Sequence, residues 1–425
     1  MNVNISRSTI SNIYIKMLIL YYIFFSGLSG KNPYFTYIIL TFQVIYFFLN
    51  FKSLTSNMKL LSYITFYVTF IFIINLFGKD MRYIRLSLSY YGYFLMFMLS
   101  LCNILIWLKE NTIQDNIKFL KTISILLNLL AIYCIIEYII KFNPIFSYFM
   151  DDSIAMLYTT KNNSWIYRVT GSATNSIVMG NLMLFSFMLN LYFLNKRNLI
   201  LILLNLATII FTFTKSVYLS LLLGVIFYIL KNLKLNNKNI ISFFLIAIII
   251  LGLSIFTQLP EAIQLTDTYR IIEFRFNNLF DQISYMQRIS TINFILEKIS
   301  SDSIIRLFFG HGPGSIKYLI KDQTQNFVVD LPVIDNQYFT FLYEYGINFF
   351  IIAVTTLIYF IATNKLKRIN DKRISKLHSA LITVLFMYLI TIGFYDGFYW
   401  HITNFFLSFI IAYLIYLYRL IQNGL

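Results

Sequence analysis

Long apolar runs separated by short polar tracts dominate the sequence. A membrane-crossing helix needs about 20 mostly apolar residues, and the backbone of such a run must bond within its own segment inside a bilayer. The pattern therefore predicts an all-α polytopic membrane protein, with residues 1–425 forming one integral membrane domain. To within a few residues, the expected spans are 13–29, 33–51, 60–78, 84–108, 119–141, 177–194, 199–213, 217–231, 239–257, 337–362, 378–400 and 402–419.

The positions of Lys and Arg predict the orientation of these twelve spans. The tract 364–376 carries six of them, and shorter basic tracts lie between spans two and three, four and five, six and seven, and after span eight. All of these tracts fall on one side if both termini lie on that side, and basic loops of inner-membrane proteins face the cytoplasm. The sequence therefore predicts a bacterial cytoplasmic membrane protein with both termini in the cytoplasm.

Two long polar segments then face outward as loops, 142–176 and 258–336. The second, between spans nine and ten, holds half of the chain's 18 acidic residues. Within it, apolar residues recur at helical spacing from Ile283 to Ile299, after Asp281 as a candidate N-cap. This spacing predicts an amphipathic helix that lies on the membrane surface or on the bundle of spans, with Arg288 at the edge of its apolar stripe.

Composition narrows the class of protein. The chain is 58% hydrophobic and 12% charged, whereas an ordinary soluble domain is about 25% charged. The net charge of +16 comes mostly from the short tracts between spans, so it does not indicate nucleic-acid binding. The sequence has no Asp-x-Asp pair, no phosphate-binding Gly-x-x-x-x-Gly-Lys-Ser/Thr loop, and no His or Cys pair at metal spacing. Any chemistry is therefore expected to use carboxylates and cations, without a metal or another cofactor.

The outward cations are few and mostly arginines, whose planar guanidinium group can bind two phosphate oxygens at once. Each one alone is better explained by snorkelling or by contact with lipid head groups, whereas the set together, including Arg168 and Arg288, favours a shared anionic ligand. The candidates are Arg82, Arg85, Arg168, Arg270, Arg275, Arg288 and Arg306, with Lys215 at the end of a span.

Acidic and glycine-rich positions form a second group of candidates. Glu137, Glu344 and Asp396 lie near outer span ends, where an acid is either functional or paired with an arginine. Asn175 and Asn181 follow Arg168 and either bind sugar hydroxyls or cap the sixth span. The stretch Gly310–Gly314 is expected to be a tight turn, with His311 exposed, or a nest of N–H groups for an anion.

The order of these pieces resembles the O-antigen polymerase and ligase family, which joins lipid-linked oligosaccharides outside the bacterial inner membrane. The resemblance covers about residues 165–350. It is carried by Arg168-Val-Thr-Gly-Ser with Asn175, Thr214-Lys215-Ser216, Arg288, Phe309-Gly310-His311-Gly312-Pro313-Gly314, Asp335-Asn336-Gln337-Tyr338 and Glu344-Tyr345-Gly346-Ile347. Two departures stand out. Lys215 precedes Ser216 where the family often has an Arg after it, and no His accompanies Asn336 as in the ligases, which favours a polymerase.

The resemblance implies a metal-independent glycosyltransferase that joins repeat units carried on polyprenyl diphosphate into an O-antigen or capsule. Its partners would be the lipid-linked donor and acceptor, membrane lipid and a protein that regulates chain length. Arg168 and Arg288 are expected to hold the diphosphate, and Asp335 or Glu344 to act as the base. The expected substrate-binding residues are Arg82, Arg85, Asn175, Lys215, Arg270, Arg275, Gly310, Gly312, Asn336 and Tyr338.

Two other functions stay open. A ligase would transfer the finished glycan to a lipid acceptor and share the donor chemistry. A flippase or transporter of lipid-linked sugars would do no bond chemistry, and such proteins place broken helices and polar residues near the middle of the membrane.

Overall fold

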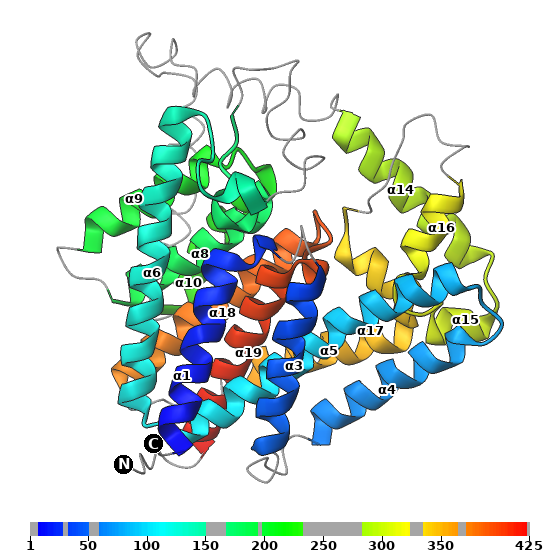
Figure 1. Ribbon diagram of the computed structural model, residues 1–425, viewed down its shortest axis with the longest axis horizontal. Coiled ribbons are helices and arrows are strands. Elements are labelled where there is room, and N and C mark those ends of the chain that lie inside the picture. The colour runs from blue at the N-terminus through cyan, green and yellow to red at the C-terminus, as the bar shows by residue number, and fades with distance from the viewer. Residues whose placement is uncertain are drawn as a thin grey trace.

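The computed structural model describes residues 7–28, 33–50, 59–149, 167–193, 198–232, 283–323, 335–363 and 371–422. Within these ranges the chain is all-helical and has no strand. The helices, shown in Figure 1, are α1 (Arg7–Leu20), α3 (Pro33–Leu49), α4 (Lys59–Leu76), α5 (Met81–Glu110), α6 (Ile113–Ile140), α8 (Ser176–Tyr192), α9 (Asn198–Phe211), α10 (Lys215–Asn232), α14 (Ile283–Ser300), α15 (Ile304–Phe309), α16 (Ser315–Gln323), α17 (Gln337–Thr363), α18 (Lys372–Ile392) and α19 (His401–Gln422).

In the described part of the chain, five helices are long and apolar enough to cross a membrane: α5, α6, α10, α18 and α19. Shorter apolar helices occupy the first, second, third, sixth and seventh predicted spans. The ninth predicted span, 239–257, lies outside the described residues. The prediction of an all-helical chain with apolar helices is therefore confirmed, and the count of twelve crossings stays a prediction.

The helices pack into a bundle in which α5 lies against α19, and α18 lies against α8 and α10. A buried polar network joins α6, α8 and α9. The side-chain amides of Asn128 and Asn190 donate to each other's oxygens, at 3.1 Å from Asn128 and 2.8 Å from Asn190. The side-chain amide of Asn205 also donates to the Asn128 oxygen, at 2.8 Å. Side-chain amides that bond across helices are typical of helix association in membranes.

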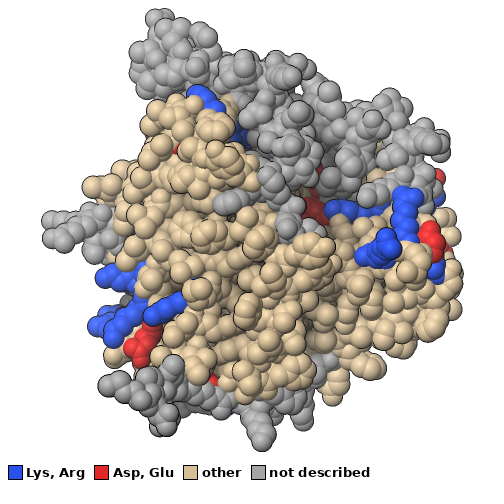
Figure 2. Space-filling model, viewed as in Figure 1, with Lys and Arg blue, Asp and Glu red and all other residues tan. Residues whose placement is uncertain are grey.

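Both chain ends lie on the same side of the bundle in Figure 1. The opposite side carries the C-terminal ends of α6, α9 and α18 and the N-terminal ends of α8, α10 and α19, and we call it the loop end. In Figure 2, Lys and Arg gather at the right and at the lower left, and uncharged side chains cover the surface between them. Such an uncharged band is what contact with lipid tails requires.

Two predicted spans differ from the observed helices. The span predicted at 378–400 begins earlier, at Lys372, and ends at Ile392, so residues 393–400 form a loop with a short turn at Gly397–Tyr399. The span predicted at 337–362 is a helix, α17, that is broken at Gly346 by a φ of 75°. Apolarity alone did not reveal either interruption, because the residues around both breaks remain aromatic and aliphatic.

The predicted amphipathic helix exists as α14, and its candidate N-cap Asp281 lies outside the described residues. Ile295 of α14 is 1% exposed and packs with Ile316 and Ile320 of α16 and Tyr343 of α17. Of the two placements left open by the sequence, packing on other helices is therefore the one observed for this part of α14.

Candidate functional site

The glycine-rich turn is bonded to the break in α17. The N–H of His311 donates to the carbonyl of Tyr343 at 3.0 Å, and the N–H of Gly312 donates to the carbonyl of Glu344 at 2.8 Å. In an unbroken helix these two carbonyls would accept bonds from the next turn. Because Gly346 interrupts the helix, they accept bonds from the glycine turn instead.

Glycine is required at this crossing for two physical reasons. Gly310 and Gly346 have φ values of 72° and 75°, which a residue with a side chain rarely adopts. A Cβ on Gly310 would lie 2.6 Å from the nitrogen of Gly346, and a Cβ on Gly346 would lie 2.7 Å from the nitrogen of Gly310. The two backbones therefore touch at a point where no side chain fits.

Glu344 ties three segments together with its side chain. One carboxylate oxygen, Oε1, accepts a hydrogen bond from the N–H of Gly314 at 2.8 Å, and the other, Oε2, accepts one from the hydroxyl of Tyr399. The residue is fully buried. A buried carboxylate without donors would be very costly, so these two bonds explain how the acid is tolerated between α17, the glycine turn and the 393–400 loop.

A second buried carboxylate, Asp396, lies in the 393–400 loop and is 5% exposed. Burial raises its pKa to about 7, while the positive charge of Lys317 on α16 opposes the rise and the negative charge of Asp335 adds to it. Lys317 lies over the ring of Tyr90, with 5.1 Å between its ammonium and the ring centroid. Two acids and a lysine from three different segments therefore share one electrostatic environment.

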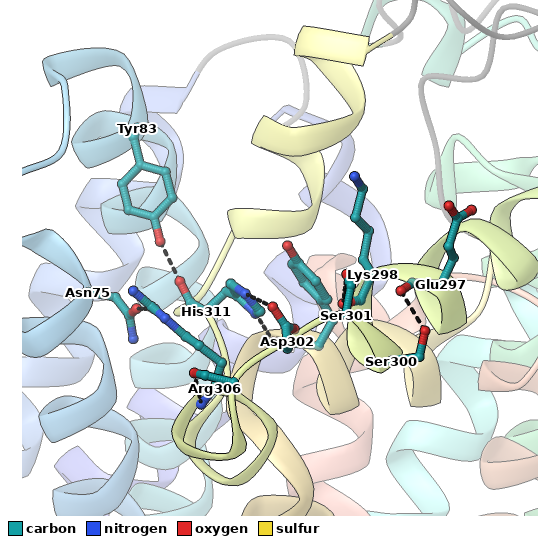
Figure 3. Close-up of polar contacts among 11 residues, drawn as sticks. Asn75, Tyr83, Glu297, Lys298, Ser300, Ser301, Asp302, Arg306 and His311 are labelled. Atoms are coloured by element: carbon teal, nitrogen blue, oxygen red, sulfur yellow. Dashed lines mark hydrogen bonds and ion pairs between the residues drawn. The ribbon is translucent and has the colours of Figure 1, made fainter.

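His311 is not the exposed turn residue that the sequence suggested. Its side chain is 20% exposed, its Nε2 lies 3.2 Å from a carboxylate oxygen of Asp302, and its ring stacks on Tyr343 with 4.2 Å between centroids. Burial lowers the pKa of His311, and the charge of Asp302 opposes this shift. The hydroxyl of Tyr83 also donates to the His311 carbonyl at 2.6 Å (Figure 3).

Arg306 lies beside this pair. Its guanidinium donates to the side-chain oxygen of Asn75, at the end of α4, and Figure 3 shows the two side chains meeting next to the His311 backbone. The glycine turn is therefore held by α5 and α17, and α15, which leads into it, is held by α4.

A second group of polar residues surrounds Arg168. Its guanidinium donates to the carbonyl of Thr212 at 3.1 Å and to the hydroxyl of Thr214 at 2.9 Å. Lys215 follows Thr214 directly and begins α10. Two cations from distant parts of the sequence therefore flank one threonine at the loop end of the bundle.

Glu137 of α6 fixes the segment that carries Arg168. Its carboxylate accepts hydrogen bonds from the Tyr167 hydroxyl at 2.8 Å, the Thr170 N–H at 3.0 Å, the Thr170 hydroxyl at 3.2 Å and the Gly171 N–H at 2.9 Å. The side-chain amide of Asn143 supports the same segment, at 3.0 Å from the Gly171 carbonyl. Residues on both sides of Arg168, namely Tyr167, Thr170 and Gly171, are thereby tied to α6.

The N-terminal part of α8 connects the two groups. Asn175 caps α8 by accepting a bond from the N–H of Ile177 at 2.8 Å, which favours the capping role among the two considered for it. Asn181, further along α8, donates to the Tyr395 hydroxyl at 2.6 Å, next to Asp396. The segment that carries Arg168 leads into α8, and the loop that carries Asp396 contacts the N-terminal half of the same helix.

The remaining predicted site residues have mixed placements. Asn336 caps α17 by accepting a bond from the Tyr338 N–H at 3.0 Å, and Tyr338 donates to the Leu389 carbonyl on α18. Arg82 lies over the Tyr318 ring at 5.5 Å, and Arg85 is exposed nearby. Arg288 belongs to α14, although its side chain is outside the described part, and Arg270 and Arg275 are outside it entirely.

Sequence reasoning left Lys317, Tyr399 and Asp302 out of the candidate site. None of them belongs to a motif, and they join the site only through contacts between distant segments. Asp396 was noticed as an acid near a span end but not assigned a role, and its position between Gly393 and Gly397 was the available signal for a loop. Within the described ranges, no group of three or more His, Cys, Asp or Glu residues is arranged to hold a metal ion.

Comparison with known proteins does not assign the chain to a family. No protein-family model and no curated protein sequence matches it.

Proposed function

We propose that this chain is a membrane glycosyltransferase that polymerises oligosaccharide units carried on polyprenyl diphosphate. The observation that carries the proposal is the pairing of two motifs from the family resemblance. Glu344 and the Gly310–Gly314 turn, distant in sequence, bond to each other through both side chain and backbone. Motifs that belong to one site are expected to meet in this way.

Cations at the loop end and at the start of α5 support the same proposal. Arg168 and Lys215 flank Thr214, and Arg82 and Arg85 lie at the start of α5. In the proposed reaction a hydroxyl of the acceptor attacks the anomeric carbon of the donor, and the diphosphate departs with the bonding electrons. Arg168 would stabilise the charge that grows on the diphosphate, and Arg288 would share this role.

Holding two lipid-anchored substrates together would supply much of the catalysis, because proximity converts a bimolecular step into a unimolecular one. The proposal places the chain in the bacterial cytoplasmic membrane, with twelve crossings, both termini in the cytoplasm and the segments 142–176 and 258–336 outside. A partner that regulates chain length fits this arrangement. The arginines would neutralise the phosphates without a metal.

A transporter or flippase of lipid-linked glycans is the second candidate, and one observation favours it. α17 is broken at Gly346 within an apolar helix, beside the buried Glu344. Discontinuous helices with buried polar groups are typical of transporter binding sites. A ligase remains a variant of the first proposal with a different acceptor.

Deletion of the gene, followed by analysis of surface and carrier-linked glycan, separates these functions. Loss of a polymerase leaves lipid cores that carry a single repeat unit. Loss of a ligase leaves polymer on the polyprenyl carrier, and loss of a flippase leaves single units on the carrier inside the cell. Either of the last two results would overturn the polymerase proposal. Restoring the gene on a plasmid controls for effects on neighbouring genes.

A further inference from the structure

The two buried acids at the glycine turn differ in how their oxygens are used. Both oxygens of Glu344 accept hydrogen bonds, from Gly314 and from Tyr399. In Asp396, by contrast, no described residue donates a hydrogen bond to Oδ1, although the residue is only 5% exposed. A buried polar atom without a partner is costly and rare in native structures. A donor supplied by a bound ligand would remove this cost.

The surroundings of Asp396 suit a group that gains and loses a proton. Burial raises the pKa of Asp396 to about 7, and an efficient general base has a pKa near the working pH. The charged groups within electrostatic reach are Lys317 on α16, Asp335 in the segment just before α17, and Glu344 on α17. The tyrosines around it are Tyr90 and Tyr93 on α5, and Tyr395 and Tyr399 in its own loop.

We propose that Asp396 accepts the proton of the attacking sugar hydroxyl, an inference that rests on the proposed glycosyl transfer. The acceptor oxygen forms its bond to the anomeric carbon while its proton moves to Oδ1 of Asp396. The bond from the anomeric carbon to the diphosphate oxygen breaks, and its electron pair leaves with the diphosphate. The proton later passes from Asp396 to water, which restores the carboxylate.

This assignment gives Glu344 a different role from the base that the sequence suggested. Its two oxygens already hold the glycine turn and Tyr399, so accepting a substrate proton would require breaking one of these bonds. Glu344 is therefore a positioning residue, which holds the glycine turn and Tyr399 and adds negative charge beside Asp396. The positive charge of Lys317 acts in the opposite direction and lowers the pKa of Asp396.

The test uses the full-length protein in lipid nanodiscs with a synthetic polyprenyl-diphosphate oligosaccharide as both donor and acceptor. Initial rates of chain extension are measured from pH 5 to 9 for wild type, Asp396→Asn, Asp396→Glu and Asp335→Asn. Asp371→Asn is the matched control, because Asp371 is an exposed N-cap at the start of α18 and Asn also serves as an N-cap. Elution profile and melting temperature verify that each variant is folded.

The wild-type rate should fall as the pH drops below about 7, because a protonated Asp396 cannot accept a proton. Asp396→Asn should lower the rate by a factor on the order of 10²–10⁴, which is the typical contribution of a general base. The fall in rate below pH 7, the acid limb of the pH profile, should be absent in this variant. Asp396→Glu should recover part of the rate and shift the limb, a result that a merely structural residue would not give.

Three outcomes would overturn the inference. Asp396→Asn with a wild-type rate and pH profile would exclude the role. Loss of the acid limb in Asp335→Asn alone would give the role to Asp335. A folded wild type that extends no chain would overturn the proposed function, and this inference with it, whereas the first two results leave the proposed function standing.

Discussion

Two buried glutamates organise the loop end of this bundle in contrasting ways. Glu137 accepts four hydrogen bonds, all from the segment that carries Arg168. Glu344 accepts two, from different segments, and stands in the field of a second acid, Asp396. The first region therefore fixes a cation in place, whereas the second concentrates negative charge near a lysine. In the proposed reaction the first region would bind the leaving group and the second would accept a proton.

Replacing Arg168 should have the largest effect on function. Removing one preorganised contact to charge that develops in a transition state typically costs about 10²–10³ in rate, so Arg168→Ala should abolish long chains while the protein remains in the membrane. Chain length on gels, at matched protein level, measures this. Arg168→Lys is the informative companion variant, because lysine keeps the positive charge but cannot donate two parallel hydrogen bonds to a phosphate. Full chain growth in Arg168→Ala would show that Glu137 fixes an arginine without a role in transfer.

Gly310→Ala tests the region of Glu344 through the backbone. Gly310 combines a φ of 72° with a ψ of −172°, a region essentially restricted to glycine that costs other residues about 1–3 kcal/mol. The added Cβ would also meet the backbone carbonyl of Glu344 and, at 2.6 Å, the nitrogen of Gly346. We expect a clearly lower melting temperature and loss of chain growth. Gly78→Ala is the matched control, because Gly78 has a similar φ of 71° but no atom within 4 Å of an added Cβ. Equal losses in both variants would mean that the crossing with Gly346 is unimportant.

Glu137→Gln should have a smaller effect that is shared between stability and activity. A glutamine offers one acceptor oxygen where the carboxylate offers two, and a buried donor left without a partner costs about 1–3 kcal/mol. We expect a lower melting temperature and a partial loss of chain growth, weaker than that of Arg168→Ala. Combining both changes sharpens the comparison, because Glu137→Gln should add little to the rate loss once Arg168 is absent. Fully additive rate losses would contradict a positioning role.

The smallest expected effect concerns His311 and pH. Burial holds the pKa of His311 in the folded protein below its value in the unfolded chain. At a pH between these two pKa values, the unfolded chain therefore binds more protons than the folded protein does. The stability that His311 contributes is therefore present above the unfolded pKa of about 6.5 and is lost as the pH falls through the folded pKa. Melting temperature measured from pH 7.5 to 5 should fall slightly, and His311→Gln should reduce this dependence. An unchanged slope in the variant would assign the dependence to other groups.

Much of the fold was accessible from the sequence, because long apolar runs in a bilayer have few alternatives to helices. A helix occupies each predicted span in the described part of the chain. The interruptions at Gly346 and Gly393–Trp400 were not accessible, since hydropathy averages over a window and ignores a single glycine. The candidate site was found in part. Motif order indicated Glu344 and the glycine turn, but the bonds from Glu137 to Thr170 and Gly171 join residues more than 30 positions apart, which no local pattern reveals.

The contact between Gly310 and Gly346 also constrains how this chain can diverge. An added Cβ on Gly310 would meet the backbone of Glu344 and Gly346, and one on Gly346 would meet the backbone of Phe308 and Gly310. Neither position can therefore change unless these same two backbone segments move apart. Distant relatives should therefore retain both glycines or lose both together, even where overall sequence similarity has disappeared. This paired identity would serve as a two-position signature for recognising homologues that comparisons of whole sequences do not detect.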